Sequence, residues 1–179
     1  MIRFRVLIPS AIVALGVSSV AARAQAPLAA GSSEAGTAIV AVTGTGVDHL
    51  VGALVHFREN TPTGSIQKST EIVDLAGDLK GRVLYHVTTV IDSVHATLVN
   101  TGDQVYSGTV GGSAPVMLHD DHFRFEVDLK TGSEKGRVYL LDHIAGPNVR
   151  CTLDVAGTGM NGDGNPTFTY TGQCIFATR

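Results

Sequence analysis

The sequence predicts an all-β protein that forms a single antiparallel β-barrel of about eight strands. Several segments alternate apolar and polar residues with a period of two, and turns containing glycine interrupt them at short intervals. After the N-terminal apolar run, no window long enough for a helix shows a 3.6-residue apolar stripe. A closed barrel is favoured over a large sandwich because the chain has no tryptophan and little aromatic mass, and because closure leaves no exposed sheet edge.

The alternation is clearest in two segments, His122–Leu129 and Gly81–Asp92. In the first, apolar residues alternate with histidine, arginine, glutamate and aspartate, which is typical of a strand buried on one face. In the second, Val83, Tyr85 and Val87 share one face. The other predicted strands are Ala38–Thr43, Leu50–Arg58, Ser65–Leu75, Thr97–Thr101, Gln104–Val110, Gly136–Ala145, Arg150–Gly157 and Thr167–Ala177. The predicted turns are Asn60–Gly64, Gly77-Asp78, Asn100–Asp103, Gly111–Pro115, Thr131–Lys135 and Gly146–Asn148.

The C-terminal segment Arg150–Phe176 predicts a β-hairpin. Two strand-like runs flank a stretch of Gly, Asn, Asp and Pro, so we expect the chain to reverse at Gly162-Asp163. This register places Cys151 opposite Cys174, at a separation that a disulfide bond tolerates. An even number of cysteines in an exported chain favours this bond over the alternative of two buried free thiols. The same register gives two further cross-strand pairs, Val155 with Tyr170 and Gly157 with Phe168.

The first 26 residues are predicted to be a secretory signal peptide. Two arginines precede an uncharged apolar run, Val6–Val20, and small residues then provide cleavage sites after Ala24 or Ala26. A membrane anchor is the alternative, but this run is shorter than the roughly 20 residues that a spanning helix needs. We therefore expect an exported protein, periplasmic or extracellular, with a flexible lead-in at 27–37 and a barrel domain at 38–179.

Charge and motifs exclude several classes of function. Signal cleavage would remove three arginines and leave a net charge of about −6, without any cluster of lysine and arginine. Neither nucleic acid nor a membrane surface is therefore an expected partner of the mature chain. The chain lacks the G-x-S-x-G and H-E-x-x-H motifs, and Gly44-Thr45-Gly46 lacks the lysine of a phosphate-binding loop. We expect no cofactor.

Two clusters contain possible metal ligands. His119-Asp120-Asp121-His122 has four, but in a strand its histidines would point to opposite faces, and no further histidine is placed beside them by spacing. A solvated turn is the preferred interpretation. Asn161–Asn165 is rich in oxygen ligands but lacks the closing glutamate of a calcium loop, and its composition fits a turn. We therefore expect no metal site.

The strand GRVLYHVTTVID and the Gly-Thr-Gly strand ends resemble the allene oxide cyclase-like and dirigent-like barrels of the calycin group. The resemblance covers the predicted barrel domain as architecture and includes no catalytic motif. It implies a barrel with an interior cavity. Some members of that group are cyclases or isomerases that shape a reactive apolar substrate, and others only bind, so the resemblance leaves both activities open.

One carboxyl group is expected inside the barrel. If Val138, Leu140 and Ile144 face inward, the alternation of Gly136–Ala145 turns Asp142 inward as well. Burial raises the pKa of a carboxyl group and suits it to proton transfer. Tyr85 and Tyr170 lie on apolar faces of their own strands and could share that interior as acid/base or orienting groups. The alternative is that this strand is inverted, with Asp142 in solvent.

Three functions remain open from the sequence. The preferred one is a barrel that binds a small apolar molecule without catalysis, because polar residues on inward faces are sparse. The second is an isomerase or cyclase that uses Asp142 with Tyr85 or Tyr170. The third is a structural or partner-binding envelope protein with a packed interior. The residues expected to line a ligand cavity are Phe123, Phe125, Leu153, Val155 and Phe168.

Overall fold

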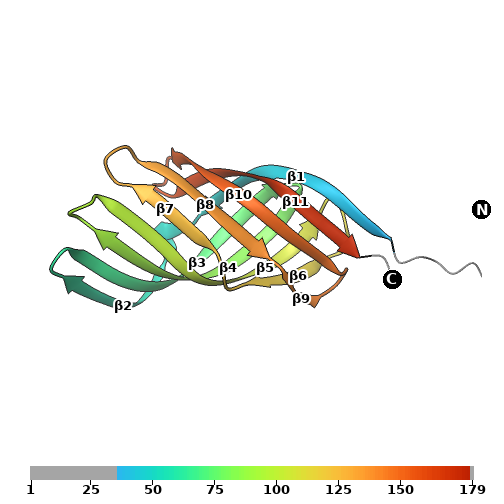
Figure 1. Ribbon diagram of the computed structural model, residues 1–179, viewed down its shortest axis with the longest axis horizontal. Coiled ribbons are helices and arrows are strands. Elements are labelled where there is room, and N and C mark those ends of the chain that lie inside the picture. The colour runs from blue at the N-terminus through green and yellow to red at the C-terminus, as the bar shows by residue number, and fades with distance from the viewer. Residues whose placement is uncertain (1–35, 178–179) are drawn as a thin grey trace, which may run out of the picture. The chain divides into compact units, whose positions relative to one another are not determined.

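The structure, a computed structural model, describes residues 36–177 and consists almost entirely of β-strands (Figure 1). The predicted signal peptide and most of the predicted lead-in lie outside the described residues. Within the described part, the helical element is the 3₁₀ turn η1 (Leu50–Gly52), and no helix is long and apolar enough to cross a membrane. The strands are β1 (Thr37–Asp48), β2 (Leu54–Thr61), β3 (Gly64–Gly77), β4 (Leu79–Asp92), β5 (Thr97–Val110), β6 (Val116–Asp120), β7 (Arg124–Asp128), β8 (Ser133–Leu140), β9 (Asp142–Ala145), β10 (Val149–Met160) and β11 (Pro166–Ala177).

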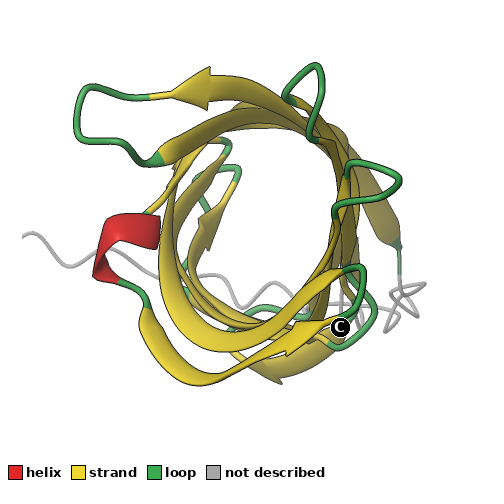
Figure 2. Cartoon of the chain, turned by 90° about the vertical axis from the view of Figure 1, so that its left-hand side faces the viewer, coloured by secondary structure: helices red, strands yellow, loops and turns green. Residues whose placement is uncertain are grey.

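Among the described residues, eight strands close into an antiparallel barrel, which Figure 2 shows from one end. The order around the ring is β1, β3, β4, β5, β7, β8, β10 and β11, and β11 pairs again with β1. Consecutive hairpins build most of this ring, and β1 closes it between the last strand and β3. The predicted single antiparallel barrel of about eight strands is confirmed.

Three further strands extend the barrel wall. β2 pairs with the first half of β3, in the region that β1 does not reach. β6 pairs with the second half of β5, beyond the part that pairs with β7, and β9 pairs with β6. β2 and β7 therefore lie toward one end of the barrel, and β6 and β9 lie toward the other.

Several local predictions were wrong. The strand predicted at Leu50–Arg58 begins only at Leu54, because Leu50–Gly52 form the 3₁₀ turn η1. Residues Asn100–Asp103, predicted to turn, continue β5 and pair with β4 throughout. The strand predicted at Gly136–Ala145 is divided between β8 and β9 by Leu141, whose amide donates to the carbonyl oxygen of Tyr139. β6 extends into the predicted turn at 119–122. At Asn100–Asp103 and in β6, pairing with a neighbouring strand outweighs the local sequence signal, as is usual for β-structure.

The end of the barrel that includes β6 is solidly packed. Most of its inward side chains are apolar and fully buried, which removes them from water and stabilises this half by roughly 1.5–3 kcal/mol for each large apolar side chain. The Tyr106 hydroxyl donates to the carbonyl oxygen of Thr109, which satisfies its polar atom within the packed region. The residues of this packed end include Leu79, Tyr106, Val110, Val116, Leu118, Val149, Cys151 and Cys174.

Three inward aromatic rings lie over glycines on neighbouring strands. At each of these glycines, an added Cβ atom would overlap the facing ring. The ring therefore occupies space that any other residue would fill with its side chain. Such pairs let large rings pack directly on the backbone of a narrow barrel. The pairs are Gly44 with Tyr170, Gly46 with Phe168, and Gly136 with Phe125.

The C-terminal hairpin of β10 and β11 has the predicted register. Cys151 faces Cys174 at a Cα–Cα distance of 4.1 Å, and the two form a disulfide bond. The reversal is stabilised by Asn161, whose Oδ1 accepts hydrogen bonds from the amides of Asp163 and Asn165. The predicted disulfide across the terminal hairpin is therefore confirmed.

Removal of the disulfide by Cys151→Ala together with Cys174→Ala should lower the free energy of unfolding by about 3 kcal/mol. The physical reason is that the bond joins residues 23 positions apart and restricts the unfolded chain. Urea denaturation of the oxidised protein, the reduced protein and the double variant would measure the effect. The reduced protein and the variant should have the same urea midpoint. A wild-type midpoint that does not change when the reductant is added would contradict the prediction.

Candidate functional site

The half of the barrel opposite the packed end encloses a cavity of about 960 Å³. The cavity lies inside the ring of strands and extends to the end that faces the viewer in Figure 2. Four turns surround this end, namely the connections β2–β3, β4–β5, β7–β8 and β10–β11. The lining residues beside these turns are Asn60, Ser65, Ile91, Leu98, Leu129, Gly132, Met160 and Pro166.

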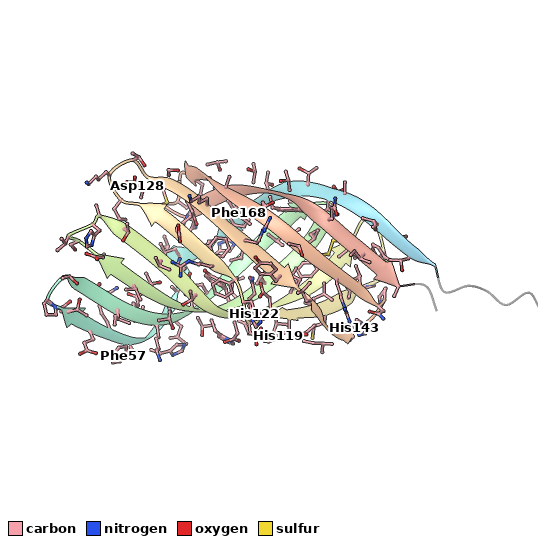
Figure 3. All side chains as sticks on the ribbon, viewed as in Figure 1. Phe57, His119, His122, Asp128, His143 and Phe168 are labelled. Atoms are coloured by element: carbon pink, nitrogen blue, oxygen red, sulfur yellow. A yellow bond between two sulfur atoms is a disulfide. The ribbon has the colours of Figure 1, made fainter. Side chains whose placement is uncertain are left out.

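Most of the deep lining is apolar. Of the five residues predicted to bind a ligand, Phe125, Leu153, Val155 and Phe168 line the cavity. Phe168 belongs to β11 and is labelled in Figure 3. Phe123 is buried outside this lining and packs against Tyr85, with ring centroids 4.8 Å apart. The other deep apolar residues are Val73, Leu75, Val83, Val138 and Leu140.

The mouth of the cavity has a polar side formed by β2 and its neighbours. Arg58 of β2 lines the mouth, and its guanidinium donates to Oε1 of Gln67 on β3, with Nε 2.9 Å away. A bulge between Val55 and Phe57 sets this part of β2 in register, so that Arg58 faces inward opposite Gln67. The remaining polar lining residues near this side are Asn60, Ser65, Thr89 and Asn100.

Three carboxyl groups line the cavity from three different strands. Asp48 ends β1, Glu71 lies in the middle of β3, and Glu134 lies near the start of β8. Glu71 faces inward because β3 alternates, and it is 5% exposed. Glu134 is half-buried and lies against Gly157 of β10, where any Cβ atom would crowd it.

Burial and mutual repulsion change the protonation of these groups. Burial, the negative charge of Glu71, a hydrogen bond with Glu71 and the charge of Glu134 together raise the pKa of Asp48 to about 8. Burial also raises the pKa of Glu134. At neutral pH, Asp48 therefore holds a proton and shares it with Glu71, whose Oε1 also accepts a hydrogen bond of 2.6 Å from Ser69 Oγ.

Tyr85 lies beside this carboxyl pair. The register of β3 and β4 places Tyr85 directly opposite Glu71, and Tyr85 is 4% exposed. Burial, with the charges of Asp48, Glu71 and Glu134, raises the pKa of the Tyr85 phenol well above its usual value, although a hydrogen bond with Asn100 acts in the other direction. The phenol therefore remains neutral and can donate a hydrogen bond.

Two oxygen atoms near this cluster have no hydrogen-bond partner within the described chain. They are Oδ1 of Asp48 and Oδ1 of Asn100, and both are buried. Buried acceptors are nearly always paired, so unpaired ones require an explanation. The combination of a shared proton, a neutral phenol and unpaired acceptors can transfer a proton or bind a group that donates hydrogen bonds.

Tyr170, predicted as an acid/base group, lines the cavity with its ring, but its hydroxyl has a structural role. The hydroxyl accepts a hydrogen bond of 2.8 Å from the amide of Leu79. Its proton points to the carbonyl oxygens of Ala76 and Leu79, both 3.1 Å away. These contacts connect β11 to the turn between β3 and β4 and leave the hydroxyl engaged with the backbone.

Asp142 lies on the outside of the barrel, so its predicted inward position was wrong. Its side chain is 70% exposed and lies 3.4 Å from Nδ1 of His119. Val138 and Leu140 face inward as predicted, but Ile144 is exposed, because the interruption at Leu141 ends the alternation before Asp142. The histidines on this outer side, His119 and His143, are labelled in Figure 3.

The last residue of β6, Asp120, has a structural role that the sequence did not indicate. Asp120 is 1% exposed, and its Oδ2 accepts hydrogen bonds from the Gln104 side chain at 2.9 Å and the Tyr139 amide at 2.7 Å. Its Oδ1 accepts from the amide of His122 at 2.7 Å. Asp120 thus joins β5, the β6–β7 turn and β8. Among residues 36–177, no group of three or more potential ligands is arranged for a metal ion.

The carboxyl cluster is not evident from the sequence, because none of the strands that carry it shows a clean alternation of apolar and polar residues. On the inward face of β3, Ser69 and Glu71 precede Val73, so each face mixes polar and apolar residues. The turn at Gly77-Asp78 could have revealed part of the cluster, because a hairpin that reverses at Asp78 pairs Glu71 of β3 with Tyr85 of β4. A shift of one residue would have turned Glu71 outward.

Comparisons of the chain with protein-family models, with curated proteins and with solved structures gave no match.

Proposed function

We propose that the protein binds a small, largely apolar molecule inside its barrel. The observation that supports this most directly is the cavity of about 960 Å³, which lies at the upper end of the range of small-molecule sites and has a mostly apolar lining. A purely structural role would not require a hollow half in a barrel whose other half is solidly packed. The turns around the mouth give a ligand a route to the interior.

We propose further that the protein is exported. The disulfide between Cys151 and Cys174 is typical of proteins that leave the reducing cytoplasm, which supports the export expected from the N-terminal sequence. A binding barrel in such a compartment would take up its ligand from the surrounding medium.

A second candidate is an isomerase or cyclase that acts on an apolar substrate. It is favoured by Asp48, whose pKa of about 8 makes it an acid that can exchange a proton near neutral pH. Asp48 would donate its proton to one atom of the substrate, Glu71 would accept a proton from another, and the Tyr85 phenol would stabilise developing charge on a substrate oxygen. This assignment replaces the predicted Asp142, which lies outside the barrel. Turnover that is lost in Asp48→Asn while binding persists would favour this candidate.

Binding is tested with a neutral environment-sensitive dye such as Nile red. Saturable binding to the purified protein is expected, and Val155→Trp should weaken it by about tenfold or more, because the indole would occupy cavity volume between Gly136 and Tyr170. The matched control is Val90→Trp on the outer face of β4, where Val90 is 42% exposed. Absence of saturable binding, or equal binding by both variants, would refute an interior site.

A further inference from the structure

We infer that the ligand of this cavity carries a protonated amine on its apolar body, and that the amine binds beside Asp48, Glu71 and Glu134. This inference rests on the proposed binding function and specifies its ligand class. An apolar cavity selects a ligand by its shape, whereas a cluster of acidic groups within it favours a ligand that carries a positive charge and hydrogen-bond donors.

The first argument is charge. None of Asp48, Glu71 and Glu134 forms an ion pair with a described lysine, arginine or histidine. The one basic side chain among the described lining residues is Arg58, which donates to Gln67 at the mouth. An ionised carboxylate in a poorly hydrated interior is energetically unfavourable without a positive charge beside it. A cation bound in this cavity would therefore be stabilised by the carboxyl groups.

The second argument is the imbalance of hydrogen-bonding atoms. Oδ1 of Asp48 and Oδ1 of Asn100 are buried acceptors without donors in the described chain, and the neighbouring carboxyl groups add further acceptors. A molecule that complements this wall must supply donors. A protonated primary amine supplies three N–H groups and a positive charge, whereas an alcohol supplies one neutral donor and a carboxylate supplies none.

The third argument is the aromatic surroundings. The rings of Tyr85 and Phe125 lie 6.2 Å apart in an edge-on arrangement, and both line the same cavity as the carboxyl groups. Aromatic faces attract cations more than they attract neutral or negative groups. The geometry of the described residues does not fit a metal ion, and the apolar floor of the cavity suits an organic body instead.

The test compares three probes with one rigid apolar body: adamantylamine, adamantanol and adamantane carboxylate. Their affinities for the purified protein are measured near neutral pH by calorimetry and by displacement of Nile red. We expect the amine to bind about tenfold or more tightly than the alcohol, and the carboxylate to bind most weakly, because a charge-assisted hydrogen bond contributes more than a neutral one.

A conservative variant identifies the source of the preference. Glu71→Gln keeps the size of the side chain and should reduce the affinity for the amine by about tenfold while leaving that for the alcohol unchanged. The control is Glu59→Gln, which removes the same charge from the exposed face of β2 near the mouth and should change neither. Wild-type binding of all three probes remains informative if either variant folds poorly.

The outcomes separate this inference from the proposed function. If the dye and the alcohol bind but the amine binds no better than the alcohol, the amine inference is wrong and the binding function stands. Preference for the carboxylate would also overturn the inference. If neither the dye nor any adamantyl probe binds, the proposed function itself fails.

Discussion

Asp48→Asn is expected to stabilise the protein in alkaline solution, by on the order of 6 kcal/mol above pH 8, and to have little effect near pH 4. The pKa of Asp48 is raised from 3.8 to about 8 in the folded protein, so the folded state keeps a proton that the unfolded chain loses. Wild-type stability contributed by this group is therefore complete below pH 4 and is lost as the pH rises to about 8. Asparagine resembles the protonated acid at every pH and can still donate to Glu71.

Urea denaturation of wild type and variant across this pH range would measure the difference. The control is Asp142→Asn, which removes a carboxyl group from the outer surface and should change the stability by less than about 0.5 kcal/mol throughout. Parallel pH profiles for wild type and Asp48→Asn would show that Asp48 is ionised in the folded protein, contrary to our interpretation of the cluster.

Gly44→Ala is expected to destabilise the protein by about 3 kcal/mol or more. Gly44 lies where β1 pairs with β3 and closes the barrel, opposite Gly77 on one side and Tyr170 on the other. A Cβ atom at this position would overlap both the carbonyl oxygen of Ala76 and the Tyr170 hydroxyl. The Ala76 carbonyl belongs to the backbone and cannot rotate away. The overlap is therefore relieved only if β1 and β3 separate, or if the Tyr170 ring moves and loses its hydrogen bonds to the β3–β4 turn.

The control for this prediction is Gly52→Ala in the 3₁₀ turn. No atom lies within 4 Å of a Cβ built there, so the substitution should leave the stability unchanged or raise it slightly by restricting the unfolded chain. Both variants are compared with wild type by chemical denaturation. If Gly44→Ala lowers the free energy of unfolding by less than about 1 kcal/mol, the contact between β1 and β3 adapts more easily than its geometry indicates.

The sequence alone was sufficient for the parts of the fold that depend on local pattern. The period-two alternation of β4 and β7 marks which side chains face the interior, and Asn and Gly residues mark the reversal between β10 and β11. In a hairpin the turn determines the register, so the pairing of Cys151 with Cys174 follows from the position of the turn. Four of the five residues predicted to line the cavity do line it, because they lie on strands with a clear alternation of apolar and polar residues.

The tertiary structure alone decided where the carboxyl groups lie. Asp48, Glu71 and Glu134 are distant in sequence and become neighbours only when β1 closes the ring beside β3 and when β8 lies across the cavity. Asp142 has the residue type and spacing of an interior acid, yet the interruption at Leu141 turns it to solvent. Alternation along one strand assigns side chains to two faces, but the closure of the barrel determines which face is inside, and therefore which acids are buried.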